Sequence, residues 1–147
     1  MSSINTSVID TILLTIAQAH ANKDAALLAS LYRPSTRLFD LAPPLSRTGM
    51  NIGDIAAWFD TWEGPINLEH QDVNTEISGN LAITTALLHM SGKKKEGEEI
   101  DLWFRATTCL KQYNGRWLII HEHTSVPFYM DGSERAALDL QPEQSST

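Results

Sequence analysis

The sequence lacks the features that would place it outside the cell or across a membrane. It has one cysteine, Cys109, so no disulfide can form within the chain, which favours a reducing compartment. It has no long hydrophobic run, because polar residues interrupt the apolar stretch 4–21. That stretch therefore predicts neither a signal peptide nor a membrane span. We expect a cytoplasmic protein with no membrane partner.

Basic residues are also scarce, at 11 against 18 acidic ones, and the formal net charge is −7. A chain with this balance does not attract a phosphate backbone, so we expect no nucleic-acid partner. The lysines at 93–95 are a local exception. Acidic residues at 96, 98 and 99 follow them at once, which indicates a solvated hairpin tip.

Motifs for cofactors and metals are missing as well. The sequence has no glycine-rich phosphate loop, no Ser-His-Asp signature and no nucleophile elbow, and we expect no cofactor. His121 and His123 form a His-x-His pair, but only His70, His89 and scattered carboxylates could complete a metal site. We therefore expect no metal. The two imidazoles either form hydrogen bonds in the sheet or line a pocket.

The first part of the chain is predicted to be mainly helical. At 147 residues and 42% apolar composition, the length and content suit one globular domain. Apolar residues spaced by three and four predict helices over 5–21 and 52–62, and Asn51 can cap the second of these. Asp24 can cap a short helix over 25–32. A short strand over 36–40 is expected before the loop at Pro43 and Pro44.

The second part changes to an apolar pattern of period two. It predicts strands over 66–77, 80–91, 99–112 and 116–126, and the dipeptide at 114–115 predicts a tight hairpin turn. Helices followed by antiparallel strands indicate an α+β fold without parallel βαβ units. The strand over 80–91 is apolar on both faces, so we expect helices or a cavity on one side and a second subunit on the other. This predicts a homodimer.

The element order over 5–127 and the sequence NGRWLIIHEHTS at 114–125 resemble the nuclear transport factor 2-like superfamily. The resemblance is to its SnoaL-like and ketosteroid-isomerase-like branch, and the last strand is also similar to the calcium/calmodulin-dependent kinase II association domain. It implies a single SnoaL-like domain over 1–147, with a core of about 5–127 and a tail at 128–147. The implied fold is a cone-shaped, curved antiparallel sheet with N-terminal helices enclosing a pocket. Enzymes and interaction domains share this fold.

The resemblance also suggests a catalytic base. The segment 31–40 is similar to the part of ketosteroid isomerase that runs from a tyrosine to its catalytic aspartate, which puts Asp40 in the position of the base. Ile16 and Thr107 fall where the isomerase has oxyanion donors, so steroid isomerase activity is not expected. A plainer alternative makes Asp40 an exposed carboxylate or a turn cap.

An arginine is the second candidate. Period two puts Trp103, Arg105 and Thr107 on one strand face, and the resemblance makes that face the inner one through Thr107. We expect Arg105 to hold a carboxylate ligand there, or else to pair with Asp40 or Glu122. Trp58 and Trp62, like Trp103, either wall an apolar cavity or pack in the core.

These residues are compatible with two functions. One is a cofactor-free isomerase, cyclase or dehydratase that removes a proton next to a carbonyl in a small, mostly apolar substrate. Asp40 would be the base, and Arg105 with His123 would stabilise the oxyanion. The other is a non-catalytic module that binds a small apolar or acidic organic ligand, or that serves dimerisation.

Overall fold

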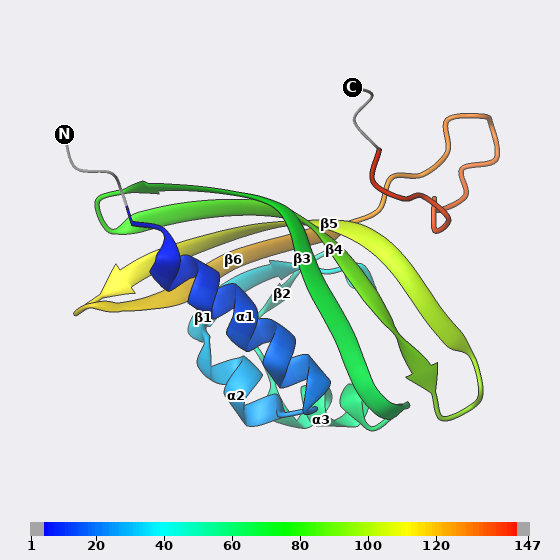
Figure 1. Ribbon diagram of the computed structural model, residues 1–147, viewed down its shortest axis with the longest axis horizontal. Coiled ribbons are helices and arrows are strands. Elements are labelled where there is room, and N and C mark those ends of the chain that lie inside the picture. The colour runs from blue at the N-terminus through cyan, green and yellow to red at the C-terminus, as the bar shows by residue number, and fades with distance from the viewer. Residues whose placement is uncertain (1–4, 144–147) are drawn as a thin grey trace.

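A computed structural model describes residues 5–143 of the chain and shows helices packed inside a curved sheet (Figure 1). The helices are α1 (Ser7–Ala21), α2 (Ala25–Ser30) and α3 (Ile52–Phe59). The Asp24 side chain accepts a hydrogen bond from the Leu27 amide at 3.0 Å, and Asn51 accepts one from the Asp54 amide at 2.9 Å. These caps fix the first turns of α2 and α3, as the sequence predicts.

The strands form one six-stranded sheet in the order β2-β1-β6-β5-β4-β3. Their bounds are β1 (Tyr32–Phe39), β2 (Arg47–Thr48), β3 (Trp62–Ser78), β4 (Leu81–Lys94), β5 (Glu99–Tyr113) and β6 (Arg116–Ser125). The α+β prediction is confirmed, and β1 alone among the described strands runs parallel to its neighbour, β6.

Three details of the sheet differ from the sequence prediction. Strand β3 begins at Trp62, which we expected to end the helix over 52–62. Strand β1 starts at Tyr32 and includes Pro34, whereas we expected a strand only over 36–40. The pairing of β1 with β6 shifts register between Tyr32 and Arg37, so the proline falls where no regular ladder is required. Strand β2 was not predicted, because two polar residues carry no periodic signal.

Helix α1 lies across the concave face of the sheet, and α2 and α3 close the space beneath it (Figure 1). Its buried residues Ile9, Leu13, Ile16 and Ala19 recur at helical spacing and face the strands. Ile66 of β3 and Phe59 of α3 complete this core and are at most 2% exposed. Within residues 5–143, no helix is long and apolar enough to cross a bilayer.

The sheet has a clear inner and outer face. On β4, Ala82, Thr84, Ala86 and Leu88 are buried toward the helices. The alternate residues Leu81 and Ile83 are 47% and 52% exposed on the outer face. The chain after β6 leaves the sheet as an irregular segment, in which Phe128 forms a single bridge with Ala136 (Figure 1).

Candidate functional site

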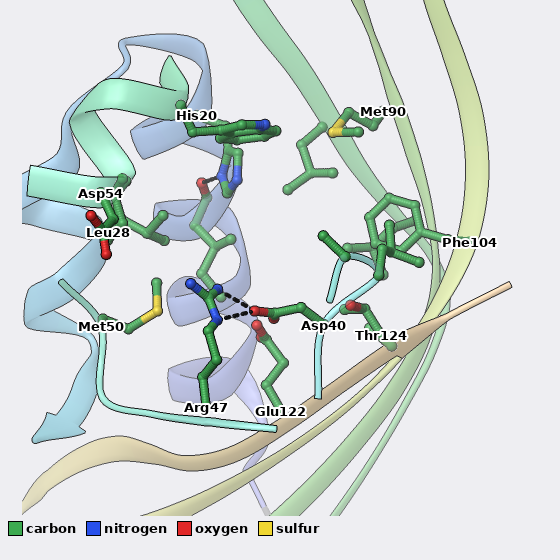
Figure 2. A pocket seen from close by; sticks show the side chains of 18 of the residues that line it. His20, Leu28, Asp40, Arg47, Met50, Asp54, Met90, Phe104, Glu122 and Thr124 are labelled. Carbon is green, nitrogen blue, oxygen red and sulfur yellow. Dashed lines mark hydrogen bonds and ion pairs between the residues drawn. The ribbon is translucent and has the colours of Figure 1, made fainter. Parts of the chain in front are cut away.

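A cavity of about 550 Å³ lies between the concave face of the sheet and the helices. This volume is within the usual range for small-molecule sites, which runs from roughly 300 to 1,000 Å³. Most of the lining is apolar, including Leu28, Met50, Met90 and Phe104 (Figure 2). Two groups of polar side chains stand out, which we name the carboxylate end and the imidazole end. The other polar residues of the lining are Asn51, Asp54, Lys94 and Thr124.

The carboxylate end comprises Tyr32, Asp40, Arg47, Thr108 and Glu122. Glu122 of β6 accepts a hydrogen bond on Oε1 from the Tyr32 hydroxyl at 2.9 Å, and on Oε2 from the Thr108 hydroxyl at 3.4 Å. Burial raises the pKa of Glu122, the hydrogen bonds from Tyr32 and Thr108 lower it, and the charge of Asp40 raises it, for a net pKa of about 7. Glu122 is therefore partly protonated at neutral pH.

Tyr32 supports this carboxyl from β1. Its side chain is 7% exposed, and burial together with the charge of Glu122 raises the tyrosine pKa well above its ordinary value. The phenol therefore keeps its proton at neutral pH and donates a hydrogen bond to Glu122. This contact fixes the position of Oε1 on the cavity wall.

Asp40 forms an ion pair with Arg47 (Figure 2). Arg47 lies opposite Leu38 in the β1–β2 pairing, which brings its guanidinium to the carboxylate just after β1. Nε donates to Oδ2 at 2.9 Å, and Nη2 contacts the same oxygen. A guanidinium carries five N–H groups, so Arg47 keeps further donors.

The imidazole end comprises His20, Trp58, Trp62 and His70. His20 Nδ1 donates to the Ile16 carbonyl at 2.8 Å, because a carbonyl oxygen can only accept. Trp58 meets the His20 ring edge-on with centroids 6.2 Å apart, and Trp62 packs against Trp58 at 5.6 Å. Burial lowers the pKa of His20, and burial with the charge of His20 lowers the pKa of His70 to about 4. Both imidazoles are neutral at pH 7.

Asp40, Trp58 and Trp62 line the cavity, and their proposed roles remain predictions. Our expectation that Trp103, Arg105 and Thr107 point inward is wrong. The cavity is lined instead by their neighbours Leu102, Phe104, Ala106 and Thr108. A shift of one residue reverses the face of every side chain in a strand, and the resemblance assigned Thr107 the inner position that Thr108 holds.

On the outer face, Arg105 Nε donates to the Ser125 hydroxyl at 3.0 Å, and the arginine is exposed. His123 lies opposite Thr107 in the β5–β6 pairing, so it also faces outward and does not reach the cavity. The predicted pairing of Arg105 and His123 as oxyanion donors at the pocket is therefore corrected. Phe39 packs edge-on against His123 with ring centroids 5.4 Å apart.

Sequence reasoning missed Glu122 as a site residue because of a bulge in β6. Leu110 pairs with Ile119, and Cys109 pairs with His121, which leaves Ile120 as an extra residue. Strict alternation from the buried Ile119 puts His121 and His123 inside, whereas the bulge turns Glu122 inward. The apolar set Phe104, Ala106 and Leu110 was a readable signal for the inner face of β5.

The described residues contain no group of three or more His, Cys, Asp or Glu side chains that would hold a metal ion. The pair His121 and His123 has ring centroids 6.5 Å apart. His121 Nδ1 instead donates to the Arg37 carbonyl at 2.7 Å, which ties this imidazole to β1.

Comparison with protein families shows that residues 9–129 match the SnoaL-like domain, and the chain belongs to that family. No curated protein matches the sequence. An NTF2-like protein of unknown function from Pseudomonas putida KT2440 is similar in structure, with a TM-score of 0.82 and 25% identity, covering 95% of this chain and 100% of its own.

Two more distant structures share the fold. A proposed dehydratase of the NTF2-like family from Streptomyces avermitilis has a TM-score of 0.68 and 16% identity, with coverage of 80% and 92%. The association domain of C. elegans CaMKII has a TM-score of 0.65 and 20% identity, with coverage of 82% and 94%. At these identities the likeness concerns the fold.

Proposed function

We propose that this protein is a cofactor-free enzyme that removes a proton next to a carbonyl in a small, mostly apolar substrate. The observation that carries the proposal is Glu122, a carboxyl held by Tyr32 on the wall of an apolar cavity and in no ion pair within residues 5–143. A general base is most effective when its pKa lies near the working pH, and that of Glu122 is about 7.

Asp40, the base expected from sequence, is less suited to that role. Its carboxylate is bound to Arg47, and one of its two oxygens already accepts from both Nε and Nη2. Asp40 instead holds the guanidinium at the cavity. The free N–H groups of Arg47 can then donate to an oxygen on which charge develops, which is the role we had assigned to Arg105.

The proposed step begins with the substrate carbonyl near Arg47 and the adjacent C–H near Glu122. The C–H bond breaks, its electron pair forms a carbon–carbon double bond, and the carbonyl π pair moves onto oxygen. Glu122 takes the proton, and Arg47 stabilises the enolate. In a β,γ-unsaturated ketone, return of the proton from Glu122 to the γ-carbon gives isomerisation. In a β-hydroxy ketone, the β-hydroxyl takes up that proton and leaves as water, which gives dehydration.

The test is the exchange of α-protons in D2O with 2-acetylnaphthalene, followed by proton NMR. Binding of this ketone is measured first by calorimetry. Glu122→Gln keeps the shape and both hydrogen-bond partners, and we expect it to slow enzyme-dependent exchange about 100-fold or more, as for loss of a general base. Glu69→Gln, an exposed position on β3, is the matched control. A ketone that binds without exchange, or a Gln variant with full exchange, would refute the proposal.

We also propose that the protein forms a homodimer through the outer face of its sheet. The specific observation is that Leu81 and Ile83 are about half exposed on the outer face of β4, where Ile83 pairs with Cys109 and Leu87 lies further along the same face. A face of this kind is typical of an interface between copies of one chain. The likeness to the CaMKII association domain supports the use of this fold in assembly.

A further inference from the structure

The imidazole end of the cavity has a polar atom that the fold leaves without a partner. His20 Nδ1 is committed to the Ile16 carbonyl at 2.8 Å, so the neutral ring carries its lone pair on Nε2. Nε2 makes no hydrogen bond with any residue in the range 5–143. Since His20 lines the cavity, this acceptor is available to whatever occupies it (Figure 2).

The surroundings of His20 restrict what can bind there. Trp58 and Phe59 flank its ring, with centroids 6.2 Å and 5.5 Å away. His70 lines the same cavity and is also neutral at pH 7. A ligand group at this end therefore meets aromatic surface and neutral imidazoles, which favour an uncharged group that can donate a hydrogen bond.

Lys94 is a cation at this end of the cavity, and its ammonium group already contacts other residues of the protein. Lys94 Nζ lies 4.3 Å from the centre of the Trp62 ring and 5.4 Å from that of Trp58. It also donates to the Thr61 hydroxyl at 3.0 Å. The ammonium thus stabilises the tryptophan wall, and a ligand carboxylate would have to displace it from these contacts.

We propose that His20 is a specificity-determining residue, which selects ligands with a hydroxyl group at the imidazole end of the cavity. The hydroxyl donates to His20 Nε2, while the body of the ligand lies along the apolar lining. This inference rests on the proposed function for one point: that the carbonyl of the same ligand lies at the carboxylate end. Figure 2 shows His20 across the cavity from Asp40, Arg47 and Glu122, so the hydroxyl and the carbonyl would occupy opposite ends.

The test is a matched set of ligands measured by calorimetry at pH 7. The probes are 6-acetyl-2-naphthol, its methyl ether, 2-acetylnaphthalene and 6-acetyl-2-naphthoate. We expect the naphthol to bind about tenfold tighter than its methyl ether, because the ether cannot donate a hydrogen bond. In His20→Phe this ratio should fall to about one, while the affinity for 2-acetylnaphthalene stays unchanged and shows that the pocket is intact.

Further variants separate this inference from the catalytic one. His20→Gln supplies an amide oxygen as acceptor and should restore part of the preference. Glu122→Gln should keep the preference in full while it loses proton exchange, so each proposal can fail alone. The inference is overturned if the methyl ether binds as tightly as the naphthol, if His20→Phe keeps the ratio, or if the naphthoate binds tightest.

Discussion

At the scale of single residues, Glu122 links the chemistry of the cavity to the stability of the fold. Its pKa is about 7 in the folded state against an ordinary 4.5, so the folded protein binds the proton more tightly than the unfolded chain. The free energy of unfolding therefore falls as the pH rises from about 4.5 to about 7, and the loss is complete above that range.

We expect Glu122→Gln to remove this pH dependence. The amide oxygen still accepts from Tyr32, and no charge forms in the cavity wall. The variant should match the wild type near pH 4.5 and exceed it at pH 8 by on the order of 3 kcal/mol. Urea unfolding across this range, with Glu69→Gln as control, measures the difference. A constant difference between wild type and Glu122→Gln would contradict the assigned protonation.

Proton exchange from a bound ketone should show the opposite trend. Only ionised Glu122 can take a proton, so the rate should rise with pH and level off above about 7. In Asp40→Asn the charge that raises the pKa of Glu122 is gone, so the midpoint should move to lower pH. A midpoint that does not move would indicate another base.

At the scale of elements, the sequence predicted the helices from two signals: an apolar period for α1 and α3, and a capping side chain for α2 and α3. Asp24 and Asn51 were readable as caps, and both accept the expected amide hydrogen bonds. The four long strands were predicted from their apolar pattern of period two. Which face of β6 looks inward was not predictable from alternation alone, since the bulge at Ile120 shifts the phase within β6.

A close contact between β4 and β3 shapes the imidazole end of the cavity. Gly92 of β4 lies against Trp62, where an added Cβ would come within 3.0 Å of the indole ring and 3.1 Å of the Pro65 carbonyl. The glycine thus leaves room for the tryptophan that closes the imidazole end. No spacing rule in the sequence indicates such a contact, because the two residues are 30 positions apart along the chain.

We expect Gly92→Ala to displace Trp62 and destabilise the fold by about 1–3 kcal/mol, as overpacking does elsewhere. Gly97→Ala is the matched control. It also has a positive φ, at 104°, but its Cβ would meet no atom within 4 Å. Thermal unfolding and the affinity for 2-acetylnaphthalene are the measurements. Equal losses in the two variants would show that backbone strain, and not the contact with Trp62, sets the cost.

At the scale of the whole molecule, the outer face of the sheet is the surface that the single chain leaves uncovered. The centre of this face on β4 and β5 carries no acidic side chain: its outward residues are Ile83, Thr85 and Leu87 on β4, and Arg105, Thr107 and Cys109 on β5. Acidic side chains border it, with Asp101 bound to His89 and Glu76 opposite Ile83, so an interface confined to the centre brings few like charges together. The helices cover only the concave side (Figure 1).

A dimer through this face would leave both cavities open on opposite sides. We expect light scattering at micromolar concentration to give twice the chain mass of 16.3 kDa. Ile83→Lys puts a charge at the centre of the proposed interface and should yield the monomer, because burying an unpaired charge is unfavourable. Leu14→Lys is the control, since Leu14 is 64% exposed on α1, away from the sheet. A wild-type mass of one chain, or dissociation by Leu14→Lys and not by Ile83→Lys, would contradict this arrangement.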